Sequence, residues 1–153
     1  MKIVSKAFEE KGEMSEVYTC DGEGINPPLE FLDIPESAKS LVLIMEDPDV
    51  PREIREDGMW NHWLVWNIPP NKTVINENSK PEGVVGRNTD NSLGYYPPCP
   101  PNGEHRYFFK LYALSTELDL EKGATREDLL FAMKGFVIDM AETVALYGGE
   151  RRR

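Results

Sequence analysis

The feature that most constrains the fold is a short, continuous apolar run near the middle of the chain, LVLIM at residues 41–45. Five apolar residues without polar alternation are typical of a strand that is buried on both faces. The run passes into Glu46 and then into Asp47-Pro48-Asp49-Val50-Pro51, where two prolines prevent further regular strand pairing. The run therefore predicts a central strand in a sheet that is covered on both sides.

Two other segments have strand patterns. The segment 62–68 alternates strictly, and the alternation divides its side chains between two faces. One face holds His62, Leu64, Trp66 and Ile68, and the other holds Trp63 and Val65. A third strand is predicted from about Arg106 to Leu114, with Tyr107, Phe109, Leu111 and Ala113 on one face and His105 pointing the same way. The spacing does not decide which of these strands are neighbours.

A helix is predicted near the C-terminus, over about 125–147. Thr125 is a suitable N-cap, and the two acidic residues that follow within the first turn suit the positive end of the helix dipole. Gly148-Gly149 would end the helix. An apolar stripe at helical spacing predicts core packing. Its members are Leu129, Leu130, Met133, Phe136, Val137, Met140 and Val144. With no internal repeat and no linker, the chain is predicted to be a single domain, 1–153, mainly β with one or two packed helices.

Charge and composition exclude several classes of function. The chain has 17 basic and 27 acidic residues and a net charge of −10, and its only basic run is Arg151–Arg153. Nucleic acids and anionic membranes attract basic surfaces, so neither is an expected partner. No apolar stretch approaches the 18 residues of a membrane span, and we expect a cytoplasmic protein. Cys20 and Cys99 form neither a secreted disulfide framework nor a zinc-binding spacing.

The candidate functional residues lie where the predicted strands begin or end. Asp47 and Asp49 leave one strand, and His62 and His105 open the other two, with Tyr107 close by. If these strand ends converge, the side chains form a polar cluster typical of a ligand pocket. Its expected aromatic walls are Trp60, Trp63, Tyr95 and Tyr96. Asp47-Pro48-Asp49 also has the composition of a plain turn, and each histidine alone could be structural.

Other chemistries have weaker support. A site of two histidines and one carboxylate could bind a metal, but no HxH, HxxxH or HExxH spacing fixes the ligands. The chain has no GxSxG nucleophile motif, no phosphate-binding GxxxxGK[ST] loop and no GxGxxG dinucleotide motif. We therefore expect no metal and no cofactor. Cys99 lies six residues before His105, which would allow a cysteine nucleophile with a nearby base, but an inert loop cysteine is the better explanation.

Five segments together resemble the phosphatidylethanolamine-binding protein family, in its short bacterial and archaeal branch. They are Thr19–Gly22 followed by Asn26–Leu29, Asp47–Pro51, Asn61–Ile68, Gly94–Tyr107 and the C-terminal segment 123–147. The resemblance implies a β-sandwich of a large and a small sheet, mostly antiparallel, with flanking helices that include the C-terminal one.

The resemblance also implies a small pocket for phosphate-like anions or a phosphorylethanolamine headgroup. Carried over residue by residue, its ligand-binding residues would be Asp47, Asp49, His62, His105, Tyr107, Pro98 and Cys99. Pro97 stands where the family has glycine, so one backbone N–H that could face the anion is missing. Cys20 and Cys99 are expected to lie near each other beside the pocket, and the resemblance leaves open whether they are bonded.

The resulting hypothesis is a binding protein that recognises a phosphorylated headgroup, small molecule or peptide and modulates a kinase or a protease. The alternative is a small hydrolase that uses His62 and His105 as acid and base, with Asp47 orienting one of them. A homodimer is also expected, because the short branch lacks a C-terminal extension and leaves apolar surface near the pocket exposed.

Overall fold

The predicted central strand is the middle of β4 (Ser40–Asp47), in which every residue is buried. This and the other elements come from a computed structural model that describes residues 1–149, so the arginines at 151–153 lie outside the described part. On one side β4 pairs with β5 (Trp60–Ile68), and on the other with β8 (His105–Leu114), antiparallel in both cases. All three predicted strands are therefore confirmed, and β4 lies directly between the other two.

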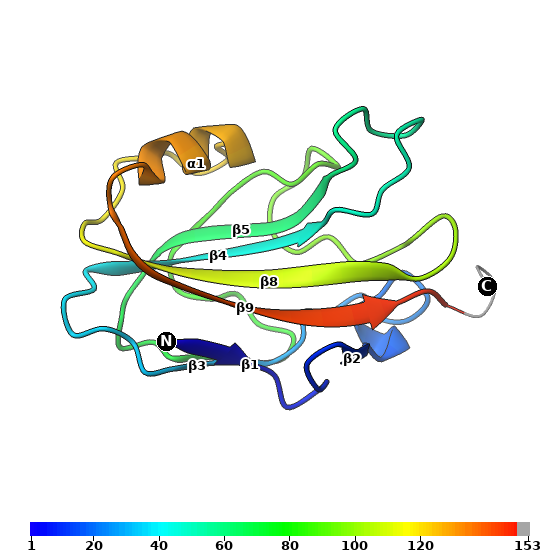
Figure 1. The fold of residues 1–153 in the computed structure, drawn as a ribbon, viewed down its shortest axis with the longest axis horizontal. Coiled ribbons are helices and arrows are strands. Elements are labelled where there is room, and N and C mark those ends of the chain that lie inside the picture. Colours follow the sequence, from blue (N-terminus) through cyan, green and yellow to red (C-terminus); the bar gives the residue numbers. More distant parts are fainter. Residues whose placement is uncertain (150–153) are drawn as a thin grey trace.

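These strands form the centre of a large sheet with the order β2-β9-β8-β4-β5-β7 (Figure 1). The outer strands are β2 (Gly12–Glu13), β7 (Val84–Val85) and β9 (Val137–Tyr147), and β2 pairs with β9 in parallel. A small antiparallel sheet has the order β1-β3-β6. Its strands are β1 (Lys2–Val4), β3 (Leu29–Leu32) and β6 (Val74–Ile75). The predicted mainly β fold with a large and a small sheet is confirmed.

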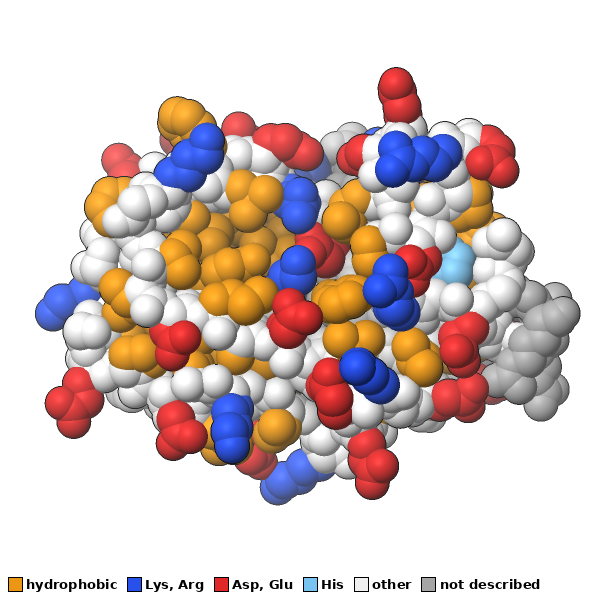
Figure 2. All heavy atoms as spheres, viewed as in Figure 1, with side chains coloured by type: hydrophobic (Ala, Val, Ile, Leu, Met, Phe, Trp, Pro, Cys, Tyr) orange, Lys and Arg blue, Asp and Glu red, His pale blue; other side chains and the backbone are white. Residues whose placement is uncertain are grey.

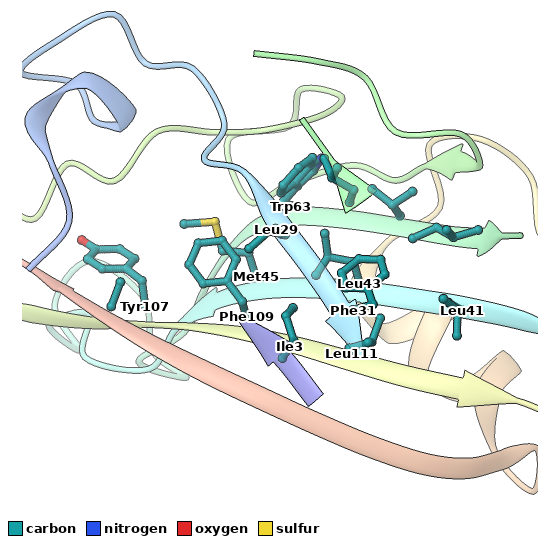
Figure 3. Close-up of a cluster of buried hydrophobic side chains, with 14 of the residues drawn as sticks. Ile3, Leu29, Phe31, Leu41, Leu43, Met45, Trp63, Tyr107, Phe109 and Leu111 are labelled. Carbon is teal, nitrogen blue, oxygen red and sulfur yellow. The ribbon is translucent and has the colours of Figure 1, made fainter. Parts of the chain in front are cut away.

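The two faces of the large sheet bury separate cores. Between the sheets, Ile3, Leu29 and Phe31 of the small sheet belong to one cluster with side chains of β4, β5 and β8 (Figure 3). On the outer face, the eight-residue helix α1 (Arg126–Met133) packs Leu129 and Met133 against a second cluster that includes Trp66. A short 3-10 turn, η1 (Glu16–Tyr18), is the other helical element. None of the helices within residues 1–149 is long and apolar enough to cross a membrane.

The prediction of a helix over 125–147 is correct at its start and wrong at its end. Thr125 is the N-cap, as predicted, and forms a capping box with Asp128. The helix ends at Met133 because Gly135 takes a left-handed conformation, with φ of 83°, just past the helix cap. The chain then becomes β9, an eleven-residue strand along β8. Helical spacing was misleading because Val137, Met140 and Val144 continue it beyond Met133, although the chain there is a strand in which only Val144 of these three is buried.

The apolar stripe is consequently only partly core. Leu129, Met133 and Val144 are buried, but Phe136, Val137 and Met140 are 42%, 44% and 37% exposed. With Phe131 and Ile138, which are exposed as well, they leave apolar surface around α1 and the start of β9. Figure 2 shows hydrophobic side chains gathered below α1 over this half of the large sheet. The prediction that the whole stripe packs in the core is therefore wrong.

Two irregularities in β5 change the predicted faces. The register with β4 shifts between Met45 and Glu46, opposite His62, and again between Leu41 and Leu43. Residue Asn67, next to the second shift, has a left-handed φ of 55°. Such bulges reverse the side-chain alternation locally. Ile68 therefore belongs to the core between the sheets with Trp63, instead of lying on the face of Leu64 and Trp66 as predicted.

Candidate functional site

Three strand ends meet at one end of the large sheet. Because β4 runs antiparallel to both neighbours, its last residues lie beside the first residues of β5 and β8. Asp47 is opposite Trp60 in β5, and Glu46 is opposite Phe108 in β8. The sequence put candidate polar residues at these three ends, and the strand order brings the ends together.

A pocket of about 200 Å³ lies at this point. It is lined by Asp47, Val50, Ile54, Trp60, His62, Tyr96, Cys99, Pro100, Pro101 and Tyr107. Four of the seven proposed ligand-binding residues are therefore in its lining, namely Asp47, His62, Cys99 and Tyr107. The other three, Asp49, Pro98 and His105, lie outside the lining.

The bulge in β5 explains how His62 comes to the pocket. Simple alternation would place His62 on the outer face with Leu64 and Trp66, as predicted. At the register shift the ring instead packs edge-on against Tyr107, with centroids 5.3 Å apart. Tyr107 belongs to the core between the sheets and lies at the end of that cluster, with its hydroxyl pointing away from it (Figure 3). Bulges often redirect a side chain beside a functional site.

His62 is buried and is held in one tautomer. Its Nδ1 lies 2.7 Å from the carbonyl oxygen of Tyr96. Because a carbonyl can only accept, Nδ1 carries the proton and the neutral ring has its lone pair on Nε2. Burial lowers the pKa of His62 to about 4, although the Tyr96 carbonyl and the charge of Asp47 both oppose that shift. At neutral pH His62 is therefore uncharged.

His105 is paired with Asp47 behind the pocket wall. Its Nδ1 is 2.7 Å from Asp47 Oδ2, its Nε2 is 3.3 Å from Asn102 Oδ1, and both His105 and Asp47 are 3% exposed. Burial lowers the pKa of His105, but the hydrogen bond and charge of Asp47, helped by Asp49, outweigh burial and raise it above 6.5. The two histidines thus have opposite pKa shifts. This pair makes His105 a group that orients Asp47.

Asp49 stabilises the start of the loop that follows β4. Its carboxylate accepts hydrogen bonds from the backbone N–H and from the guanidinium of Arg106, at 2.8–2.9 Å. The Arg106 hydrogen bond is the main reason why the pKa of Asp49 is lowered. The backbone N–H of Asp49 in turn donates to Asp47 Oδ1 at 2.8 Å. Asp49 therefore fixes the loop and Asp47, so its expected direct contact with a ligand has no support in this geometry.

The predicted proximity of the two cysteines is confirmed, and they are bonded. Cys20 and Cys99 form a disulfide with Cα atoms 5.4 Å apart. The backbone N–H of Cys20 also donates to the carbonyl of Pro98 at 3.1 Å. Pro98 therefore anchors the loop that supplies Cys99, Pro100 and Pro101 to the pocket. As a disulfide, Cys99 has no thiol to act as a nucleophile.

The aromatic walls predicted for one pocket divide between two cavities. Trp60 and Tyr96 line the histidine pocket, but Trp63 and Tyr95 line a separate cavity. The Trp60 indole N–H is buried and has no hydrogen-bond partner among residues 1–149. Val50 and Ile54 were missed, because loop residues beyond a proline carry no alternation that would indicate their direction.

The described part of the chain lacks the group of ligands that the metal-binding alternative needs. Within residues 1–149, no group of three or more His, Cys, Asp or Glu side chains could hold a metal ion. Both ring nitrogens of His105 already face carboxylate or amide oxygens. The pocket therefore offers one neutral imidazole, one carboxylate and the Tyr107 phenol among apolar walls.

Comparisons with known proteins cover almost the whole chain. Residues 4–148 match the family described as phosphatidylethanolamine-binding protein. A protein named UPF0098 in Chlamydia trachomatis is 48% identical over 147 residues, covering 96% of this chain and 98% of its own. One of the same name in Methanothermobacter thermautotrophicus is 48% identical over 153 residues, with the same coverage.

Solved structures agree. A crystal structure of a phosphatidylethanolamine-binding protein homolog from Chlamydia trachomatis superposes with a TM-score of 0.95 at 47% identity, covering 97% of each chain. The structure of YbcL from E. coli, described as a new member of the mammalian family, gives a TM-score of 0.85 at 26% identity. The latter covers 95% of this chain and 96% of YbcL.

Proposed function

Because the chain belongs to the phosphatidylethanolamine-binding protein family, we propose that it is a binding protein whose histidine pocket takes a small phosphate-like anion. The ligand would be a phosphorylated headgroup, or a phosphorylated small molecule or peptide. The observation that carries the proposal is the convergence of Asp47, His62 and Tyr107 on a pocket of about 200 Å³. That volume suits a headgroup better than a whole drug-sized ligand.

The protonation states specify how such an anion would bind. Neutral His62 presents an acceptor at Nε2, and Asp47 is also an acceptor, so a fully ionised dianion would face two of them. A phosphate monoester that keeps one P–OH can donate to His62, while its remaining oxygens accept from the Tyr107 phenol and the Trp60 indole N–H. Binding therefore takes the monoanion, or takes up one proton together with the dianion.

Titration of the protein with O-phosphorylethanolamine and with inorganic phosphate, followed by NMR, tests the proposal. The amides around residues 47, 62 and 107 should shift first, and affinity for O-phosphorylethanolamine should increase as pH falls from 8 towards 6, near the monoester pKa of about 6. Tyr107→Phe removes one donor and should weaken binding about tenfold, or 1.4 kcal/mol. Glu30→Gln, on the small sheet, is the matched control. Shifts centred elsewhere would refute the site.

His105→Ala separates positioning from ligand contact. Since His105 lies behind Asp47, its loss leaves a buried carboxylate without its partner and should lower the free energy of unfolding by about 2–3 kcal/mol. His105→Gln, which keeps a donor for Asp47, should restore part of this stability. If affinity for phosphate in the folded protein falls with His105→Ala and recovers with His105→Gln, His105 acts on the ligand by holding Asp47.

The hydrolase alternative is based on the Asp47–His105 pair, because acid–base catalysis often uses a histidine that a carboxylate orients. Its His105 Nε2 faces Asn102 rather than the pocket, so the pair would have to turn before it could act on a substrate. Assays of phosphomonoesters and carboxylic esters address this alternative directly. Turnover that disappears with His62→Gln would favour an enzyme over a binding protein.

The homodimer and a kinase or protease partner stay predictions. The largest group of exposed apolar side chains lies around α1 and the start of β9, at the opposite end of β8 from His105, instead of near the pocket as expected. Self-association would depend on this surface, because large exposed apolar patches are unusual in monomers. Sedimentation at tens of micromolar, compared between the protein and Phe136→Ser, tests the dimer. A clean monomer in both would remove it.

A further inference from the structure

The larger cavity of the structure lies apart from the histidine pocket. It measures about 580 Å³ against about 200 Å³, and the two share no lining residue. Neighbouring residues serve the two sites: His62 and Tyr96 line the pocket, whereas Trp63 and Tyr95 line the larger cavity. The larger cavity thus lies next to β5 and β7 at one edge of the large sheet. Its volume is in the range of sites for drug-sized molecules.

The floor of this cavity is apolar and aromatic. Trp63 and Val65 come from the core between the sheets, and Val85 and Leu93 come from the segments that follow. The Trp63 and Tyr95 rings meet edge to face, with centroids 5.3 Å apart. Trp63 is 2% exposed, and its indole N–H has no acceptor among residues 1–149, whereas that of Trp66 donates to Leu120. Trp63 and Val65 thus form the buried base of the cavity, and the apolar surface open to a ligand comes from Val85, Leu93 and Tyr95, which are half-buried or exposed.

One wall of the cavity is held rigid by a buried asparagine. Asn26, 6% exposed, donates through its Nδ2 to the carbonyls of Pro27 and Asn76. Its Oδ1 accepts from the backbone N–H of Ser79 at 2.9 Å, and its carbonyl accepts from that of Asn78. Every polar atom of this side chain is used to fix the 76–79 segment. The wall is therefore formed before any ligand arrives, which lowers the entropic cost of binding.

The charge of the cavity is opposite to that of the protein. The chain has a net charge of −10, but the charged residues in the lining are Lys80 and Lys122, with no carboxylate. Among residues 1–149, neither lysine has a carboxylate within the 4.0 Å that defines the ion pairs of Lys6, Lys72 and Lys110. Two unpaired ammonium groups at an apolar cavity favour an anion there over the surrounding acidic surface.

We propose that this cavity is a second binding site, which takes an amphiphilic organic anion with a flat aromatic body and one acidic group. The aromatic body would lie against Val85, Leu93 and Tyr95, and the acidic group would face Lys80 and Lys122. This proposal does not depend on the function proposed for the histidine pocket, because the two sites have no residue in common.

The dye 8-anilinonaphthalene-1-sulfonate is a suitable probe, because it has an aromatic body, one sulfonate and a fluorescence that rises in apolar sites. The double variant Lys80→Gln/Lys122→Gln should bind it about three- to tenfold more weakly at low salt, since both positions are exposed and each charge contributes modestly. Raising salt from about 0.05 M to about 0.5 M should weaken binding to the unaltered protein and have little effect on the variant. Lys72→Gln, outside the cavity, should bind normally.

Two further observations locate the dye. Its NMR shifts should centre on residues 85, 93 and 95, and saturation of the protein with inorganic phosphate should not displace it. Equal binding by the double lysine variant and the unaltered protein would overturn the proposal. Dye shifts centred on the exposed residues Phe131, Phe136 and Met140 would also overturn it, because they would assign the dye to the outer face. Displacement by phosphate would place the dye in the histidine pocket and would overturn it as well.

Discussion

Two adjacent carboxylates of β4 are buried to the same degree and serve different purposes. Glu46 is 2% exposed and faces the outer side of the large sheet, where Lys110 and Arg126 bind it at 2.5 and 2.7 Å. Asp47 is 3% exposed and lies at the pocket, where its partners are His105 and a backbone N–H. One strand thus places a permanently neutralised carboxylate on one face and a carboxylate with a titratable partner on the other.

Glu46 and Asp47 differ in the kind of charged group that each of them binds. Burial lowers the pKa of Lys110, but its hydrogen bond to Glu46 outweighs burial and raises it, so this cation is charged at any physiological pH. The imidazole of His105 gains or loses its proton near that range. On the outer face, Glu46 is therefore a fixed structural joint between β4 and α1, which it binds through Arg126. On the inner face, the charge of the Asp47–His105 pair changes with pH.

The largest effect is expected from Glu46→Ala. It leaves Lys110 and Arg126 close together without their common counter-ion and should lower the free energy of unfolding by about 3–5 kcal/mol. Urea unfolding gives this value. Glu30→Ala, which breaks the exposed ion pair with Lys6, is the control and should cost about 1 kcal/mol or less. Phosphate affinity of the folded protein should not change. A similar loss in both variants would show that Glu46 is no structural joint.

Reduction of the disulfide is expected to affect the pocket side. The bond joins positions 79 residues apart and should contribute about 2–4 kcal/mol. Its loss also frees the 97–103 loop, so phosphate binding should weaken, in contrast to Glu46→Ala. Melts with and without dithiothreitol measure the first effect, and the Cys20→Ser/Cys99→Ser variant, which should not respond to the reductant, is the control. Unchanged binding after reduction would show that the pocket needs no covalent support.

The pH dependence of the free energy of unfolding should show the contribution of His62. Its pKa is about 4 in the folded protein and about 6.5 when unfolded, so the unfolded chain takes up the proton first as pH falls. The stability linked to His62 is complete above pH 6.5 and is lost between pH 6.5 and 4, by up to about 3 kcal/mol. His105 has a raised pKa and contributes with the opposite sign: its stabilisation is present below pH 6.5 and is lost as pH rises through its folded pKa.

Comparison with His62→Gln isolates the first contribution, because His105 is present in both proteins. The stability difference between the unaltered protein and the variant should shrink as pH falls from 7 to 4. A difference that stays constant over this range would mean that His62 takes up its proton near pH 6.5 in the folded protein as well, and the assignment of His62 as a neutral acceptor between pH 6.5 and 4 would then be wrong.

Much of the fold was predictable because its signals are local. The apolar run of β4, the alternation of β8 and the cap at Thr125 each depend on a few neighbouring residues. The end of the helix was not predictable in this way, because the apolar residues of 137–147 continue the helical spacing and no alternation marks the change from a helix to a strand. The left-handed Gly135 decided between them, and a single glycine cannot be distinguished in advance from one that a helix tolerates.

The site depended on less local information. The resemblance to a family grouped Asp47, His62, His105 and Tyr107, but alternation alone placed His62 on the wrong face, since a bulge is a property of two paired strands. Asp47 was expected to orient one of the two histidines, but the sequence did not indicate that this histidine is His105 or that His105 lies outside the pocket lining. The division of the four aromatic walls between two cavities likewise depends on the paths of loops, which have no period.

The smallest effect is expected at the cap of α1, where the outer face can be weakened without touching a charge. Thr125 accepts from the Asp128 backbone N–H, and Asp128 accepts from that of Thr125, next to Arg126 on Glu46. Thr125→Ala should lower the free energy of unfolding by about 1 kcal/mol, and Thr125→Ser, which keeps the hydroxyl, by much less. In a Glu46→Ala background the cap should matter less, because α1 has already lost its ion pair. A double-mutant cycle measures this coupling. If the two effects simply add, Glu46 stabilises the sheet alone and the helix is held by Leu129 and Met133, so the ion pair would not be what joins α1 to β4.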